Sequence, residues 1–234
     1  MKPEQLEDLD PFDLFDAEAD RLDRHFDSLG DQDWLRPSGC VGWSVRDVLA
    51  HLAGEELYNR ACLDGDVAGF YRTLEREGVT GMDSFNQWCV DQRRDLPVGD
   101  VLAEWRTESG ETRRRMRDRG REGSLETSVG PYPAGLQAFH YASEYATHAD
   151  DIGVPVESYE EPGRTEWRAR VGQFALAERH SPAEVEPLDG RFRVSVGNVG
   201  AELSAADFVT ATVDRLPPDH PLDPALRTAL ACLA

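Results

Sequence analysis

The stretch GWSVRDVLAHLAGEE, residues 42–56, carries the signals of a helix start followed by an amphipathic helix. Ser44 and Asp47 have the spacing of a capping box, in which the two side chains satisfy backbone N–H groups at a helix N-terminus. An apolar stripe follows, made of Val45, Val48, Leu49 and Leu52. We therefore predict a helix over residues 45–62. His51 lies on the flank of this stripe, where a single histidine is more often a core or boundary residue than a metal ligand.

The charge of the chain limits its partners. The 234 residues include 45 acidic and 25 basic side chains, which give a formal net charge of −20. Such a charge repels nucleic acids and anionic membranes over long range, so we exclude both as main partners. The apolar content of 40% is enough to build a hydrophobic core. Lys2 is the one lysine of the chain, a usage that points to a GC-rich genome.

The cysteines and the N-terminal segment indicate a cytoplasmic protein. The four cysteines contain no CxxC pair, and the first ten residues, MKPEQLEDLD, contain no apolar signal segment. No apolar run approaches the roughly 20 residues that span a bilayer. We expect reduced thiols, and we expect Cys40 to be a loop-packing residue because no His/Asp arrangement beside it is visible in the sequence.

Four long helical patterns occupy the first two thirds of the chain. They cover residues 11–29, 45–62, 100–119 and 136–152, with a short helix from residue 84 and connecting segments at 64–81 and 121–135. No convincing strand interrupts residues 1–155. The sequence therefore predicts a mainly α protein whose first domain, residues 1–157, is a four-helix bundle.

The tail has a different pattern. After the linker VPVESYEEPG, a helical pattern precedes the alternating segment RFRVSV, residues 191–196, and the turn signal GNVG. The segment SAADFVTATVDRL, residues 204–216, reads as a closing helix. We predict a small C-terminal α/β domain over residues 165–234.

One side of the helix predicted at 136–152 is polar in an unusual way. His140, Glu144 and His148 recur every four positions and so point to the same side, opposite a row of alanines. This side can face water, or it can face the bundle, where buried imidazoles and carboxylates must be paired or bound to metal. A solvated face in this protein would carry mostly Arg and Glu, so the composition of the face favours the second reading.

Glu144 and His148 are one helical turn apart and can reach a single ion, with His51 as a third ligand. Two imidazoles and a carboxylate suit Zn²⁺ and leave an open position for water or substrate. His140 is an alternative third ligand, but it lies about 12 Å from His148 along the helix axis, which makes sharing one ion difficult.

The segment WLRPSGCVGWSVRDVLAHLAGEE, residues 34–56, resembles the N-terminal region of the mycothiol-dependent maleylpyruvate isomerase family, a branch of the DinB-like metal-binding bundles. The resemblance covers residues 10–155 and extends weakly into the tail. It implies that His51, together with the E-x-x-x-H pair Glu144 and His148, binds zinc or another divalent metal. It also implies mycothiol as a partner, which agrees with an actinobacterial source.

The resemblance further implies a reaction. Mycothiol becomes a thiolate and drives cis–trans isomerisation of the maleylpyruvate-to-fumarylpyruvate type, or thiol S-transfer, on a small acidic electrophile. Arg215 is the positional candidate for the family arginine that binds the acidic substrate. Tyr141, beside Glu144, is a candidate proton donor or a packing residue. Glu55 or Asp151 can orient a ligand imidazole.

Two other functions remain open from the sequence. One is a non-catalytic metal-binding, ligand-binding or regulatory module, and the other is hydrolysis by zinc-bound water without any thiol. The sequence leaves the oligomeric state, monomer or homodimer, undecided. A requirement of turnover for thiol would distinguish the mycothiol-dependent enzyme from the hydrolase.

Overall fold

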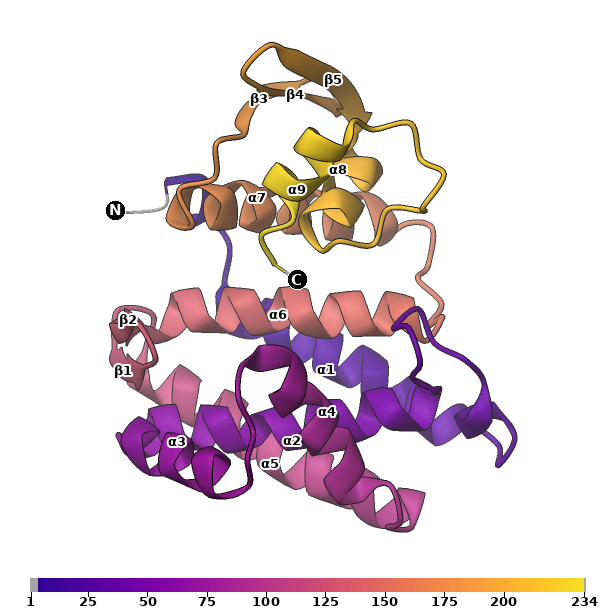
Figure 1. The fold of residues 1–234 in the computed structure, drawn as a ribbon, viewed down its shortest axis with the longest axis vertical. Helices are drawn as coiled ribbons and strands as arrows, with labels where there is room; N and C mark the ends of the chain where they lie inside the picture. The colour runs from indigo at the N-terminus through magenta and orange to yellow at the C-terminus, as the bar shows by residue number, and fades with distance from the viewer. Residues whose placement is uncertain (1–3, 234) are drawn as a thin grey trace. The chain divides into compact units, whose positions relative to one another are not determined.

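The computed structural model describes residues 4–233 and divides the chain into two compact units (Figure 1). One unit, Pro11–Val154, holds the long helices. The other holds residues 155–233 together with residues 4–10. Residues 1–157 were predicted to form the bundle domain, whereas the structure groups residues 4–10 with the C-terminal part of the chain.

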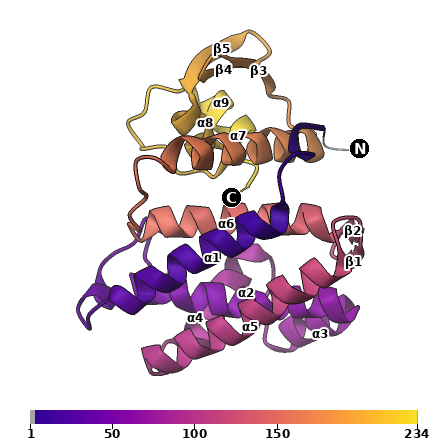
Figure 2. The same cartoon turned by 180° about the vertical axis from the view of Figure 1, so that it is seen from behind.

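The bundle unit is almost entirely helical. Its elements are α1 (Pro11–Ser28), η2 (Asp33–Leu35), α2 (Val45–Asp64), α3 (Val67–Arg76), α4 (Met82–Arg93), α5 (Val98–Arg119), β1 (Ser124–Thr127), β2 (Gly130–Pro133) and α6 (Ala134–Asp151). The four long helices form the bundle, in which α1 lies along α6 and α2 along α5 (Figures 1 and 2). The prediction of a mainly α fold is confirmed.

Helix α2 begins and ends where local chemistry requires. The Ser44 side chain accepts from the backbone N–H of Asp47, and the Asp47 side chain accepts from the backbone N–H of Ser44, so the capping box is complete. Gly65 ends the helix in the left-handed region, at φ 70°. This fixed start determines which side of α2 carries His51.

Two segments that were expected to be irregular contain regular structure. Residues 121–135 contain an antiparallel hairpin in which Leu125, fully buried, lies opposite Tyr132. Its strands of four residues are too short to show an alternating pattern, and its Gly and Pro content resembles a loop. Residues 64–81 contain α3, whose N-terminus is capped by the Asp66 side chain accepting from the Gly69 backbone N–H.

The C-terminal unit is a small α/β structure, as predicted. Its elements are η1 (Glu4–Leu6), α7 (Glu161–Glu178), β3 (Glu184–Leu188), β4 (Arg191–Val196), β5 (Val199–Ser204), α8 (Ala205–Thr212) and α9 (Pro224–Leu230). The strands pair antiparallel in the order β3-β4-β5, and Phe192 stacks on Phe208 at 4.3 Å between ring centroids. Sequence patterns did not reveal β3 or α9. Among residues 4–233, no helix has the length and apolarity needed to cross a bilayer.

Candidate metal centre

Three side chains predicted as ligands meet between α2 and α6. The Nε2 atom of His51 lies 3.3 Å from Oε1 of Glu144, and Nε2 of His148 lies 3.2 Å from the same oxygen. The donor atoms of the three residues all lie within 4.8 Å of one another. The structure thus brings together residues that are 93 positions apart in sequence.

Both imidazoles are buried, while the carboxylate is partly open. His51 is 2% exposed and His148 6% exposed, whereas the Glu144 side chain is 33% exposed. The Glu144 side chain is therefore the part of the cluster that is most open. Three protein ligands would leave a further coordination position on a bound metal ion, as in catalytic zinc sites.

Charge in the cluster is balanced by the carboxylates. Burial acts to raise the pKa of Glu144, but hydrogen bonds with His148 and His51 hold it well below the usual value. Burial lowers the pKa of His51. Burial also acts to lower the pKa of His148, but its contacts, led by that with Asp151, raise it well above the usual value. A metal ion bound at Nε2 of His148 would take the place of a proton on that nitrogen.

Asp151 holds the ring of His148. Its Oδ2 atom lies 3.0 Å from Nδ1 of His148, which leaves Nε2 of the same ring directed at Glu144. A carboxylate on the second ring nitrogen is the usual support of a metal-binding histidine. Nδ1 of His51 has no such partner among residues 4–233, and the ring of Trp43 packs beside it at 5.1 Å between centroids.

Replacing Asp151 with Asn should lower the affinity for zinc by about tenfold to a hundredfold, because the His148 ring loses its charged support. Competition of the protein with a chromophoric chelator for zinc measures this affinity. Asp150→Asn is the matched control, since Asp150 is its neighbour and is exposed. Equal zinc affinity in the wild type and Asp151→Asn would remove Asp151 from the metal centre.

Glu55 is a buried carboxyl group close to the cluster. It is 6% exposed, and its Oε2 atom lies 3.9 Å from Nε2 of His51. Burial, followed by the charges of Glu144 and Glu56, raises its pKa well above the usual value. It faces the ligating nitrogen of His51 rather than Nδ1, so it is not placed to orient that ring through its second nitrogen.

The Oε1 atom of Glu55 is buried and has no hydrogen-bond partner among the described residues. Leaving a buried polar atom unpaired is costly. A cation or a hydrogen-bond donor bound beside the Glu55 carboxyl group would remove that cost, so this orphan oxygen fits a centre that takes up a metal ion or ligand.

The other predicted residues lie outside the three-residue cluster. The ring of Tyr141 stacks on Phe15, 5.9 Å between centroids, and burial is the main cause that raises its pKa well above the usual value. His140 is paired with Tyr132 of β2 at 3.1 Å. Arg215 belongs to the C-terminal unit, where its guanidinium donates to the carbonyl of Val213.

The sequence shows no His/Asp arrangement beside Cys40, but the structure places both a histidine and an aspartate there. Its Sγ atom lies 3.1 Å from Oδ2 of Asp151 and 3.7 Å from Nδ1 of His148. More than a hundred residues separate Cys40 from these partners in sequence, so no local pattern could have revealed the contact.

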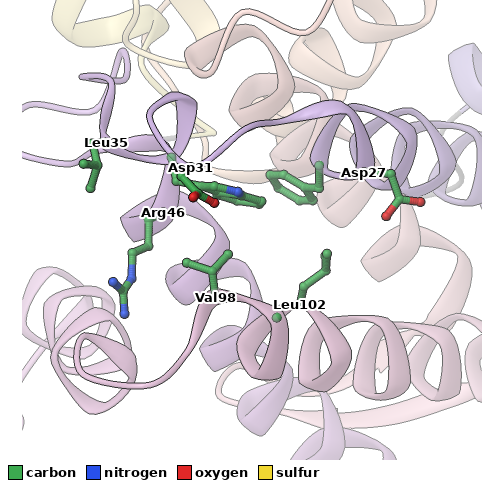
Figure 3. A pocket seen from close by; sticks show the side chains of 9 residues that line it. Asp27, Asp31, Leu35, Arg46, Val98 and Leu102 are labelled. Atoms are coloured by element: carbon green, nitrogen blue, oxygen red, sulfur yellow. The ribbon is translucent and has the colours of Figure 1, made fainter.

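A separate pocket opens elsewhere on the bundle unit. It has a volume of about 450 Å³, and Figure 3 shows Arg46, Val98 and Leu102 around it, with Asp31 opposite. None of the three cluster residues lines this pocket. The candidate metal centre therefore does not coincide with this pocket, and its donor atoms define it.

Comparison with known protein families identifies the bundle unit. A family model described as the mycothiol maleylpyruvate isomerase N-terminal domain matches residues 15–153. The matched region contains all three cluster residues and ends before the C-terminal unit. Searches of curated proteins and of solved structures found no match.

Proposed function

The chain belongs to the mycothiol maleylpyruvate isomerase N-terminal domain family, and on this basis we propose that it is a zinc-dependent enzyme that activates mycothiol as a thiolate. The reaction would be cis–trans isomerisation of the maleylpyruvate-to-fumarylpyruvate type, or S-transfer of the thiol to a small acidic electrophile. The observation that carries this proposal is the convergence of His51, Glu144 and His148 on one point.

The donor set suits zinc. Two imidazole nitrogens and one carboxylate oxygen are common ligands of catalytic zinc, and three protein ligands leave a fourth position for a thiol. When bound, zinc supplies positive charge that stabilises a thiolate relative to its thiol at neutral pH. The accessible side of Glu144 and the orphan oxygen of Glu55 support a site that receives such a guest.

The residues of the chain have separate tasks in this proposal. Asp151 keeps His148 oriented through Nδ1. We assign the thiol proton to the Glu55 carboxyl group, whose Oε2 atom lies 3.9 Å from Nε2 of His51 and whose Oε1 atom no described residue satisfies. Tyr141 retains its proton at neutral pH, since its pKa is raised, and therefore serves as a hydrogen-bond donor to the substrate. Arg215 of the C-terminal unit is our candidate cation for the substrate carboxylates.

Calorimetric titration of the zinc-loaded full chain with mycothiol tests the proposal, followed by turnover of maleylpyruvate with and without the thiol. We expect heat of binding in the wild type, none in His51→Ala, and turnover that requires mycothiol. No heat with the zinc-loaded wild type would contradict thiol activation. Turnover without thiol would instead indicate a zinc hydrolase, and thiol binding without turnover would indicate a binding module.

A further inference from the structure

A second group of donor atoms lies on the other edge of His148. Sγ of Cys40, Nδ1 of His148 and Oδ2 of Asp151 form a triangle with sides of 3.7, 3.0 and 3.1 Å. All three atoms are close enough to bind one ion. A sulfur, a nitrogen and an oxygen atom at these separations form a mixed donor set for a divalent cation.

The loop before α2 brings Cys40 close to Asp151. The backbone N–H of Gly39 donates to the carbonyl of Asp151 at 2.7 Å, and a Cβ atom at Gly39 would lie 2.5 Å from Oδ1 of Asp151. Only glycine allows the loop to approach α6 so closely. Within the loop, the backbone N–H of Cys40 donates to Oγ of Ser38 at 3.1 Å. The Gly39 hydrogen bond thus holds the loop against the end of α6, and the Ser38 hydrogen bond fixes Cys40 within the loop.

The arrangement does not have the geometry of a catalytic triad. In a triad, the nucleophile and the acid contact different nitrogens of the histidine ring. Here both Cys40 and Asp151 contact Nδ1 of His148. One nitrogen cannot donate a proton to Asp151 and accept one from Cys40 at the same time, so a nucleophilic role for Cys40 has no support in the geometry.

We propose that Cys40, Asp151 and Nδ1 of His148 form an alternative metal site for soft divalent cations, and that this site and the His51 centre exclude each other. Thiolate ligands favour soft cations. The His51 centre has nitrogen and oxygen ligands only, whereas the alternative site has sulfur. The two sites should therefore differ in which ion they prefer.

The exclusion follows from the chemistry of one imidazole ring. A neutral imidazole has one nitrogen with a free lone pair, and the other nitrogen carries the proton. When Nδ1 of His148 binds a cation, the proton occupies Nε2, where Glu144 at 3.2 Å accepts it. Nε2 is then no ligand for the His51 centre. Binding at the alternative site also transfers the thiol proton of Cys40 to solvent, together with the second proton of His148 when that ring starts as a cation.

The other cysteines do not offer competing thiolates at neutral pH. Burial raises the pKa of the Cys62 thiol to about 11, and it raises the pKa of Cys89 and of Cys232 to about 12. All three are buried, whereas Cys40 is partly exposed. Among the described cysteines, Cys40 is the one grouped with a nitrogen and an oxygen donor, so a metal–thiolate signal should come from Cys40.

Titration of the metal-free full chain with Cd²⁺ tests the site through the ultraviolet charge-transfer absorption of a cadmium–thiolate bond. We expect this band in the wild type and in the matched control Cys62→Ser, and we expect none in Cys40→Ser. Asp151→Asn should need at least about tenfold more Cd²⁺, since the neutral amide oxygen is a weaker ligand than the carboxylate. No band in the wild type, or a band retained in Cys40→Ser, would overturn the proposal.

The His51→Ala variant separates this inference from the proposed function. This variant lacks the His51 centre. A cadmium–thiolate band that remains in it shows that the alternative site binds metal whether or not the proposed thiol activation is correct. Loss of the band would overturn the proposal of a separate site. The exclusion is tested by adding Cd²⁺ to zinc-loaded protein and measuring both ions after equilibrium dialysis. We expect zinc release as the band grows. Uptake of cadmium with full retention of zinc would overturn the exclusion.

Discussion

His148→Ala and His51→Ala are each expected to lose nearly all bound zinc. Each substitution deletes one of three ligands, and a change in a residue that merely orients a ligand already costs about tenfold to a hundredfold in affinity. The loss for a ligand itself should therefore be about a hundredfold or more. Elemental analysis after dialysis against a weak chelator measures the zinc that remains on each variant.

His140→Ala is the matched control for these variants. His140 lies on the same helix, two turns before His148, and it is paired with Tyr132 rather than with the cluster. This variant should retain the zinc content of the wild type. Full zinc retention in both His51→Ala and His148→Ala would rule out the proposed ligand set.

Glu56→Ala should produce a large loss of stability in the bundle unit. Glu56 is buried and accepts hydrogen bonds from Tyr145 of α6, Thr112 of α5 and Asn59 of α2. Removing the carboxyl group leaves three buried donors without their acceptor, at about 1–3 kcal/mol each. We expect the free energy of unfolding to fall by about 3 kcal/mol or more, measured by urea denaturation.

Glu56→Gln is the matched control for this network, since it keeps the volume and one acceptor oxygen. Burial raises the pKa of Glu56 above its ordinary value of 4.5, although its hydrogen bonds act to lower it. The folded state therefore binds this proton more tightly than the unfolded state does, and stability from this group falls as pH rises through the raised pKa. As pH rises over that range, the wild type should lose stability relative to Glu56→Gln, because the amide of the variant does not titrate. A pH-independent difference would show that Glu56 does not titrate there.

Local signals in the sequence were enough to predict the bundle. The capping box at Ser44 and the stripe after it set the start and the facing of α2, and the four-residue spacing of Glu144 and His148 placed both on one side of α6. The sequence leaves open whether the polar side of α6 faces water or the bundle. Both the alanine row and the polar side face neighbouring elements, since the alanines are buried and the polar side lies against α2. The short hairpin at 124–133 was missed because four-residue strands show no clear period.

The surroundings of the metal centre could not be predicted in the same way. Cys40 contacts Asp151 because the loop before α2 packs on the end of α6. A backbone hydrogen bond between Gly39 and Asp151, which are far apart in sequence, holds the loop there. Glu55 was a reasonable candidate to orient His51 from its spacing on the helix. The rotation of the His51 ring, which turns Nε2 toward Glu55, is set by packing in three dimensions.

X-ray absorption at the zinc edge of the zinc-loaded full chain, recorded without and with mycothiol, tests the central claim most directly. Without thiol, we predict a first shell of nitrogen and oxygen atoms at about 2.0–2.1 Å and no sulfur. Saturating mycothiol should add one sulfur at about 2.3 Å. Sulfur in the thiol-free protein would place zinc at Cys40 instead, and a shell still free of sulfur after mycothiol is added would contradict thiol activation at this centre.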